Sequence, residues 1–440
     1  MTIEAAGALS LLNAGAVRDR AHRMLEMGLG GELSGFRIDL GRLGATADLV
    51  LAITRKAYPT LDVPFHSRWR HFVVDGVDRW AALADAMLWR DAEDRARAEF
   101  DLAIISVLLD AGAGPSWRYR DSVTGTRIGR SEGLALASLD MFARGLFSAK
   151  AGEPLRADAA ALERLTMADL RSGFQVGDDN PLVGLEGRVA LLRRLGEQVS
   201  ASPQIFAAHD APRPGGLFDH LAQAGDWEAI AAPSILSELL LRFGTIWPSR
   251  ITLDGIPLGD CWRYPALKTE RATGGLMPLH KLSQWLSYSL IEPIERAGLR
   301  VTDIDGLTGL AEYRNGGLFL DMGVLVLRDP ADAQREHDVG SPLVVEWRAL
   351  TVALLDRLAE LLRQRIGLDA VSLPLAKILQ GGTWAAGREL AFERRPDGSP
   401  PLRIVSDGTV FSTRSGHSQG KKACKASRSW ITRWSSTSLR

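Results

Sequence analysis

Residues 343–366 read LVVEWRALTVALLDRLAELLRQRI and form the longest helical pattern in the chain. Apolar side chains return at steps of three and four residues, as at Trp347, Leu350, Leu354 and Leu358. This spacing predicts one long helix with a continuous apolar face.

Shorter segments have the same period. Residues 186–199 and 281–291 each predict a helix, and Pro293 is expected to end the second one. Residues 101–110 are apolar enough for a central buried helix, although a buried strand also fits that length.

Strand-like segments are few, and we find them at residues 251–253, 318–327 and 402–411. The sequence therefore predicts a mainly α protein with a few short strands, in which loops rich in Gly and Pro carry the polar clusters.

The charge of the chain is balanced overall but uneven along its length. It has 440 residues, with 53 Lys and Arg against 53 Asp and Glu. Residues 412–440 hold seven basic and no acidic side chains, so residues 1–411 carry a net charge of about −7. A body of this sign does not hold a nucleic-acid backbone by general electrostatics. Any phosphate that it binds must meet a local cluster of donors.

The composition also predicts how the chain is organised. We expect residues 1–411 to form a single catalytic unit, with a weak boundary near 149–180 that separates subdomains 1–150 and 175–411. Residues 412–440, rich in Ser, Lys and Arg, are expected to form a disordered basic tail.

Cysteine content and apolar runs indicate the compartment. Cys261 and Cys424 are too few for a disulfide framework, and no paired-cysteine metal motif is present. The N-terminal segment lacks the basic start of a signal peptide, and the longest apolar run, residues 102–109, is shorter than the roughly 18 residues that cross a bilayer. We expect a cytoplasmic protein without membrane or nucleic-acid partners. The sequence does not indicate its oligomeric state.

The first polar cluster is residues 65–72, FHSRWRHF. Arg68, Arg70 and the two histidines, His66 and His71, stand beside aromatic rings and can grip an anion or stack on a planar group. The alternative is an aromatic loop packed on the core. His66 and His71 lack a nearby thiol or carboxylate and make a poor metal site, so we predict no metal and no cofactor.

The second cluster is residues 256–265, a rigid loop that presents Asp260, Trp262 and Arg263 together. Asp260 is able to orient a catalytic base or bind a sugar hydroxyl, and the alternative is an Asp that caps a turn. Glu346 and Arg348, at the start of the long helix, either point into a pocket or simply suit the helix dipole.

The third cluster, residues 279–285, places His280 and Lys281 at the start of a predicted helix, where an ammonium and the helix N-terminus both favour a phosphate. The alternative is a solvated lysine.

The fourth cluster, residues 307–317, places Glu312, Tyr313 and Arg314 before the pair Gly316-Gly317. Glu312 is suited to stabilise a developing positive charge, and the alternative is a turn held by a Glu–Arg pair. The two glycines are expected to let the backbone approach a ligand or take a positive φ.

Three stretches of the sequence resemble a known family. FHSRWRHF at 65–72, RSEG at 130–133 and EYRNGGL at 312–318 look like the uracil-catabolism proteins of the ring-opening pyrimidine pathway. The resemblance covers nearly all of residues 1–411.

A more distant similarity is to the queuosine-salvage family of nucleotide 5'-phosphate N-glycosylases. It runs through residues 110–117, 181–196 and 278–324 and includes the motifs Lys281-Leu282-Ser283-Gln284, Asp303-Ile304, Leu307-Thr308, Ala311-Glu312-Tyr313-Arg314 and Glu346-Trp347-Arg348-Ala349. The similarity implies a helical fold related to helix-hairpin-helix DNA glycosylases. It also implies that Glu312, where that family has Asp, is the catalytic carboxylate and that Lys281 binds a phosphate.

Together the resemblances imply hydrolysis of the C–N bond of a ring-opened uridine nucleotide, ribosylurea 5-phosphate, to urea and ribose 5-phosphate. Glu312 would stabilise the oxocarbenium-like state and orient the water. The other catalytic candidates are Asp260, which would help to fix Glu312, and Glu346 or His66 as the acid. Lys281, with Arg68 or Arg70, would hold the 5'-phosphate. The substrate-binding candidates are Lys281, Tyr313, Arg314, His66, Arg68, Arg70, Trp117, Trp262, Arg263, His280 and Arg348. The alternatives are an amide or ureido hydrolase of the same pathway and a non-catalytic nucleotide-binding protein.

Overall fold

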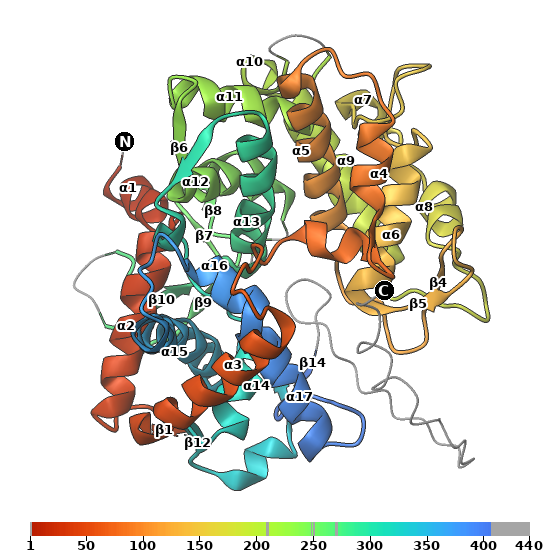
Figure 1. Ribbon diagram of the computed structural model, residues 1–440. Coiled ribbons are helices and arrows are strands. Elements are labelled where there is room, and N and C mark those ends of the chain that lie inside the picture. Colours follow the sequence, from red (N-terminus) through yellow and green to blue (C-terminus); the bar gives the residue numbers. More distant parts are fainter. Residues whose placement is uncertain (1, 208–210, 248, 250, 269–271, 406–440) are drawn as a thin grey trace.

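The computed structural model describes residues 2–207, 211–247, 249, 251–268 and 272–405. The fold is mainly helical, as predicted (Figure 1). The α-helices are α1 (Ile3–Ser10), α2 (Ala14–Leu29), α3 (Leu43–Ala57), α4 (Arg79–Asp85), α5 (Ala92–Leu108), α6 (Arg130–Ala143), α7 (Ala159–Glu163), α8 (Met167–Gly173), α9 (Leu185–Ser200), α10 (Pro203–Phe206), α11 (Leu217–Ala224), α12 (Ala232–Phe243), α13 (Lys281–Arg296), α14 (Tyr313–Asp321), α15 (Pro342–Ile366), α16 (Leu375–Ile378) and α17 (Trp384–Arg394).

Shorter helical turns join these helices. The 3₁₀ turns are η1 (Leu40–Arg42), η2 (Arg68–Phe72), η3 (Pro214–Gly216), η4 (Gly244–Ile246), η5 (Ile304–Gly306) and η6 (Pro330–Ala333). One segment, η7 (Leu379–Thr383), is a π-helix that runs directly into α17.

The strands are short, as predicted, and within the described residues they form two-stranded pairs only. The antiparallel pairs are β1 (Phe36–Ile38) with β12 (Leu325–Leu327), β2 (Val73–Val74) with β3 (Val77–Asp78), β4 (Tyr119–Arg120) with β5 (Arg127–Ile128), β7 (Thr252–Leu253) with β8 (Ile256–Pro257) and β9 (Cys261–Arg263) with β10 (Leu276–Pro278). The parallel pairs are β6 (Ala229–Ala231) with β11 (Arg300–Thr302) and β13 (Glu336–Asp338) with β14 (Arg403–Val405).

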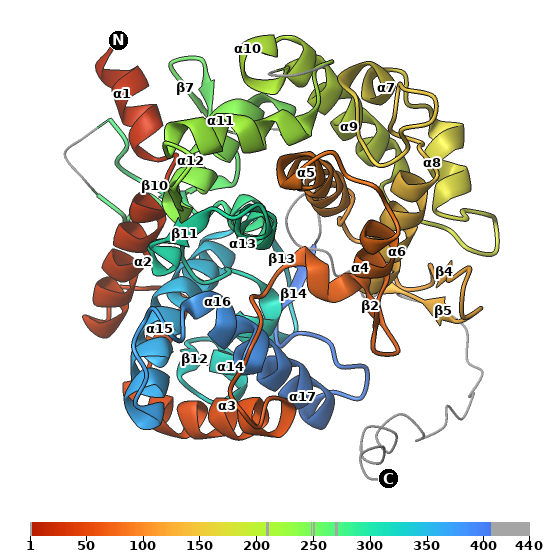
Figure 2. The same ribbon diagram turned by 45° about the horizontal axis from the view of Figure 1, so that its top comes forward.

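Helix α15 is the long helix predicted from residues 343–366, and its ends follow from the sequence. Ser341 caps the N-terminus by accepting a hydrogen bond from the Val344 amide, and Pro342 occupies the first turn. Gly367 ends the helix in the left-handed conformation at φ 77°. Helices α2, α3 and α14 pack on it, so helices that are far apart in the sequence share one core (Figures 1 and 2).

The central helix α13 corrects the prediction that Pro293 ends it, because the helix continues to Arg296. Proline has no amide hydrogen, so the carbonyl of Ser289 loses its usual partner four residues later. The Trp69 indole donates a 2.7 Å hydrogen bond to that carbonyl instead. The Ser289 hydroxyl also accepts a hydrogen bond from the Arg68 amide. Helix α13 therefore survives its proline because η2 is docked against it.

The remaining segment predictions have mixed outcomes. Residues 101–110 lie mostly in the buried helix α5, which excludes the strand alternative, and 186–199 lie in α9. Residues 318–327 begin in α14 and only end in β12, so the strand prediction there was partly wrong. Of 402–411, residues 403–405 form β14; residues 406–411 and the predicted tail at 412–440 lie outside the described residues.

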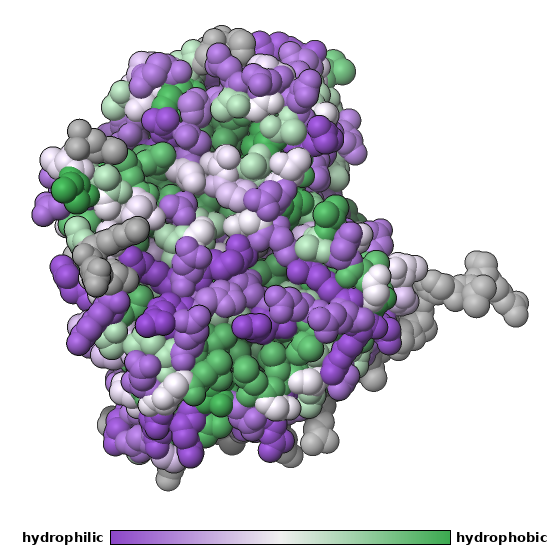
Figure 3. Space-filling model, turned by 90° about the vertical axis from the view of Figure 1, so that its left-hand side faces the viewer, coloured by the Kyte–Doolittle hydropathy of each residue, from purple (hydrophilic) through white to green (hydrophobic). Residues whose placement is uncertain are grey.

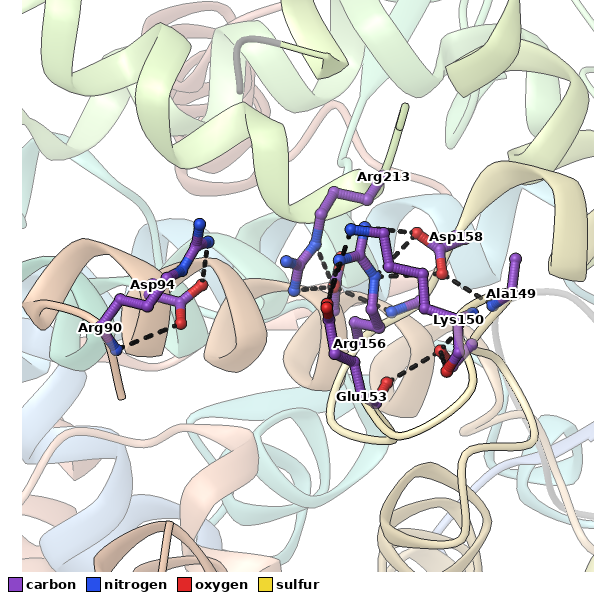
Figure 4. A network of polar contacts seen from close by, with 11 residues as sticks. Arg90, Asp94, Ala149, Lys150, Glu153, Arg156, Asp158 and Arg213 are labelled. Carbon is purple, nitrogen blue, oxygen red and sulfur yellow. Dashed lines mark hydrogen bonds and ion pairs between the residues drawn. The ribbon is translucent and has the colours of Figure 1, made fainter. Parts of the chain in front are cut away.

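The segment predicted as a weak boundary, 149–180, contains α7 and α8, which pack on α9. Figure 4 shows the polar network that holds its first part. Arg156 donates to both oxygens of Asp158, and Asp158 accepts a 2.7 Å hydrogen bond from the Ala149 amide. The neighbouring Ala157 amide donates to Asp101 on α5 at 2.9 Å. The division into subdomains and the likeness to DNA glycosylases stay predictions.

The surface that carries α1 and α2 mixes hydrophilic and hydrophobic residues, with a hydrophobic area in its lower half (Figure 3). No helix formed by the described residues combines the length and the apolar composition that crossing a bilayer requires.

The exchange of hydrogen-bond partners at Pro293 can be measured by a double-mutant cycle. Trp69→Phe leaves the buried Ser289 carbonyl without a donor, which costs about 1–3 kcal/mol of unfolding free energy in addition to lost packing. In a Pro293→Ala background the new amide restores the helical bond, so the same change should cost roughly 1 kcal/mol less. Urea denaturation measures both. Equal costs in the two backgrounds would contradict this role of Trp69.

Candidate functional site

Glu312 lies at the N-cap of α14, just before its first residue. Its backbone is extended, and its carboxylate accepts hydrogen bonds from the amides of Arg314 at 2.8 Å and Asn315 at 2.5 Å. Burial raises the pKa of Glu312, whereas these amides and the charge of Lys281 lower it. The carboxylate is thus fixed in position by its own helix while its side chain stays half-buried.

The pair Gly316-Gly317 does not take the positive φ that was one of its two expected roles. Both glycines lie inside α14, and neither has a positive φ. A Cβ atom on Gly316 would lie 2.7 Å from the indole ring of Trp347. Gly316 therefore allows α14 to pack tightly on α15, which sets the position of Glu312 at the start of α14.

Lys281 is the first residue of α13 and is also half-buried. Burial lowers its pKa, while the carboxylates of Glu312 and Asp110 oppose that change. Lys281 forms no ion pair with a described carboxylate, and its ammonium lies 5.8 Å from the centre of the Trp285 ring. The charges of Lys281 and Glu312 thus each affect the other group's pKa, although no ion pair joins the two side chains.

Asp260 connects the backbone segments that carry Lys281 and Glu312. It forms a bidentate ion pair with Arg348 at 2.8 and 2.9 Å and accepts hydrogen bonds from the Trp262 indole and the Lys281 amide. Burial alone would raise the pKa of Asp260, but Arg348 and these hydrogen bonds hold it well below its usual range. Arg348 also donates to the Ala311 carbonyl at 3.3 Å. The ion pair therefore joins the start of α13 to the residue before Glu312.

A second buried contact connects two of the predicted motifs. Gln284 accepts a hydrogen bond from the Thr308 amide at 3.0 Å and donates to the Thr308 hydroxyl. Tyr288 donates to the Thr308 carbonyl at 2.9 Å. Lys281-Leu282-Ser283-Gln284 and Leu307-Thr308 thus lie against each other although they are far apart in sequence.

The first polar cluster, residues 65–72, contributes two arginines that already have partners. Arg68 is fully buried and donates to Asp110 at 2.7 Å, to the Ser106 hydroxyl at 2.7 Å and to His71 Nδ1 at 3.2 Å. Arg70 pairs with Glu292 at 2.6 Å. Both arginines are therefore committed to carboxylates, which weakens their prediction as phosphate ligands.

His66 and His71 both feel the charge of Lys281. Burial lowers the pKa of His66 to about 4 and lowers that of His71 well below its usual value. Both rings are therefore neutral at pH 7. Lys281 connects five half-buried residues: its pKa responds to Glu312 and Asp110, and the pKa values of His66 and His71 respond to it. We call these five residues the central cluster.

The structure adds residues that the candidate set omitted. His71 and Asp110 belong to the central cluster, and the Trp285 ring lies 5.6 Å from the His71 ring. Arg130, at the start of α6 with φ 57°, lies near Tyr313. Burial raises the pKa of Tyr313, and the charge of Arg130 opposes that rise. Asp110 and Arg130 both fall in the stretches that carried the family resemblances. These resemblances were the sequence signal that could have identified the two residues.

Other candidates do not join the central cluster. Glu346 is fully buried and accepts hydrogen bonds from Ser34, from the Gly35 amide and from the Tyr264 hydroxyl. Its predicted role as an acid therefore has no support in the geometry.

Most of the remaining candidates are held by backbone carbonyls elsewhere in the fold. Trp117 is buried with its indole bonded to the Phe174 carbonyl, and Arg263 is exposed on β9. His280 bonds to the Leu11 carbonyl, while Arg314 donates to the Gly398 carbonyl and lies over the Tyr313 ring.

Within the described part of the chain, no group of three or more His, Cys, Asp or Glu side chains is placed to hold a metal ion.

Comparison with known proteins gives three matches. Residues 10–411 match the family described as "Protein of unknown function (DUF1688)". Protein urg3 of Schizosaccharomyces pombe is 37% identical over 413 residues, which cover 91% of this chain and 98% of that protein. Uracil catabolism protein 4 of Lachancea kluyveri is 37% identical over 415 residues, which cover 87% of this chain and 93% of that protein.

The ion pair between Asp260 and Arg348 should contribute strongly to the stability of the fold. Asp260→Asn leaves the buried Arg348 cation without its carboxylate and should cost about 3–5 kcal/mol of unfolding free energy. Asp329→Asn, which breaks an exposed pair with Arg335, is the matched control and should cost less than about 1 kcal/mol. Urea denaturation compares them, and equal small costs would contradict the anchoring role.

The coupling of Lys281 and Glu312 predicts a titration shift. Because the ammonium lowers the pKa of Glu312, Lys281→Met should make this carboxyl titrate at higher pH than in the unmodified protein. Carbon-13 NMR of the glutamate carboxyls measures it, with Glu312→Gln to assign the signal. Lys56→Met on the exposed side of α3 should leave it unchanged. An unchanged Glu312 titration in Lys281→Met would show that the two groups are not coupled.

Proposed function

This chain belongs to the DUF1688 family, and from this membership and its relatives' names we propose that it acts in uracil catabolism as an N-ribosyl hydrolase. The proposed substrate is ribosylurea 5-phosphate, and the products are urea and ribose 5-phosphate. The observation that carries the proposal is the fixed carboxylate of Glu312, which two backbone amides hold at the start of α14 and whose pKa the ammonium of Lys281 affects without an ion pair between them.

The carboxylate suits the chemistry at the anomeric carbon. When the C1'–N bond breaks, positive charge develops on the sugar ring, and a fixed anion in low dielectric stabilises it. Glu312 is held by two amides and is not neutralised by an ion pair with a described side chain. In the proposal it faces C1' and orients the water that adds there. The water supplies the hydroxyl to C1', and its remaining proton balances the one that the leaving nitrogen gains.

Lys281 is the proposed ligand of the substrate's 5'-phosphate. Among the cations predicted for this role, Arg68 is paired with Asp110 and Arg70 with Glu292, whereas Lys281 has no ion-pair partner in the described residues. A phosphate between the lysine and the solvent would also offset the cost of burying the ammonium. Arg130 adds positive charge next to Tyr313.

The general acids expected from the sequence, Glu346 and His66, are not retained in the proposal. Glu346 is engaged in a separate network and His66 is neutral at pH 7, so the proposal gives neither of them the role of a general acid. Burial raises the pKa of Tyr313, so its phenol keeps its proton beside Glu312. In the proposal Tyr313 donates a hydrogen bond to the ribose or to the leaving nitrogen.

Urea release from ribosylurea 5-phosphate tests the proposal. Glu312→Gln should lower the rate about 100- to 1000-fold, because it removes the charge that stabilises the transition state. Binding of ribose 5-phosphate should be largely kept. Glu312→Asp retains both the carboxylate and a good N-cap and should retain more activity than Glu312→Gln.

Glu238→Gln on α12, which pairs with His220, is the matched control and should stay within about twofold of the unmodified rate. A fully active Glu312→Gln enzyme would exclude the proposed role. Binding without any urea release by the unmodified chain would favour a nucleotide-binding protein, and a product with urea carbon lost but nitrogen still on the ribose would favour a ureido hydrolase.

A further inference from the structure

The two histidines of the central cluster present opposite hydrogen-bonding groups. His71 Nδ1 lies 3.2 Å from Arg68 Nη1, and a guanidinium only donates hydrogen bonds. Nδ1 must therefore accept, and the neutral ring carries its proton on Nε2. Nε2 of His71, the ring nitrogen that does not contact Arg68, is thus a donor.

His66 is fixed in the other tautomer. Its Nδ1 lies 3.0 Å from Gln380 Oε1, while Gln380 Nε2 donates to the Tyr58 hydroxyl at 3.3 Å. The oxygen of Gln380 accepts, so the proton of His66 is on Nδ1 and its Nε2 carries a free lone pair. The outer nitrogen of His66 is thus an acceptor.

The surroundings keep both rings in place. Gln380 belongs to the π-helical segment η7, a rare geometry that is frequent at functional sites, and the His66 amide donates to the Ala376 carbonyl at 3.0 Å. The His71 ring packs against Trp285. Neither Nε2 atom has a hydrogen-bond partner in the described residues, and neither is sealed from solvent.

We propose that His66 and His71 form a donor–acceptor pair that recognises the uncharged ureido group of the substrate. His66 Nε2 accepts a hydrogen bond from the terminal NH₂, and His71 Nε2–H donates to the carbonyl oxygen beside it. Gln380 and Arg68 are positioning residues that fix the two tautomers. This inference rests on the proposed function and names the part of the substrate that the enzyme reads.

The chemistry of the pair excludes other ligand groups. A phosphate or carboxylate offers only acceptors and would leave the lone pair of His66 facing a negative charge. An ammonium or guanidinium offers only donors and would face the Nε2–H of His71. A neutral amide or ureido group presents one of each side by side, which matches both rings.

Ligand binding in the Glu312→Gln background tests the inference without turnover. His66→Phe and His71→Phe should each weaken ribosylurea 5-phosphate about tenfold, the usual effect of one lost hydrogen bond in a protein site, and should change ribose 5-phosphate less than about twofold. His220→Phe on α11 is the matched control and should change neither. Equal losses for both ligands in the cluster variants would place the histidines at the sugar phosphate and overturn the inference.

A ligand-side measurement covers a variant that does not fold. N-acetyl-ribosylamine 5-phosphate keeps the carbonyl but replaces the terminal NH₂ with a methyl group. It should bind about tenfold more weakly than ribosylurea 5-phosphate when His66 is present, and equally in His66→Phe. Equal binding in the presence of His66 would overturn the inference. Failure of the proposed function is distinguishable, because it appears as no urea release by the unmodified enzyme.

Discussion

The ion pair between Asp260 and Arg348 connects the segments on which the site depends. Asp260 receives two hydrogen bonds from Arg348, one from the Trp262 indole and one from the Lys281 amide, and Arg348 reaches on to the Ala311 carbonyl. Removing both charges from water is costly, and only complete hydrogen bonding offsets that cost. The benefit is positional, because one buried pair sets where α13 begins and where the chain turns into α14. Lys281 and Glu312 stand at those two points.

The same burial gives the site its electrostatic character. Half-buried Glu312 has a raised pKa, and Lys281 and both histidines have lowered pKa values, because few water molecules remain to stabilise their charged forms. No ion pair among the described residues neutralises either Lys281 or Glu312, and strongly perturbed groups of this kind are concentrated at functional sites. The tight packing of α14 on α15 through Gly316 fixes the start of α14, where Glu312 stands.

The sequence predicted those features that depend on local periodicity. The long helix at 343–366 and the helix at 186–199 appear as α15 and α9, because an apolar face repeated at helical spacing is sufficient to specify them. The sequence did not reveal that Pro293 lies inside α13, because the compensating donor, Trp69, is remote in the chain.

Residue type alone did not reveal the partners of the site residues. Glu346 and Asp260 have the right chemistry for catalysis, but their hydrogen-bond partners lie in distant loops and helices. His71 was rejected as a metal ligand because no carboxylate or thiol neighbours it in sequence, yet Arg68 connects it to Asp110 in space. Pairings that cross the chain were beyond a reading of single segments.

The most direct measurement is a crystal structure of the Glu312→Gln protein with ribosylurea 5-phosphate bound. The proposed function predicts the phosphate at the Lys281 ammonium, C1' facing the side chain at position 312 and the ureido group between the two histidine rings. A ligand bound away from Lys281 and position 312 would contradict it.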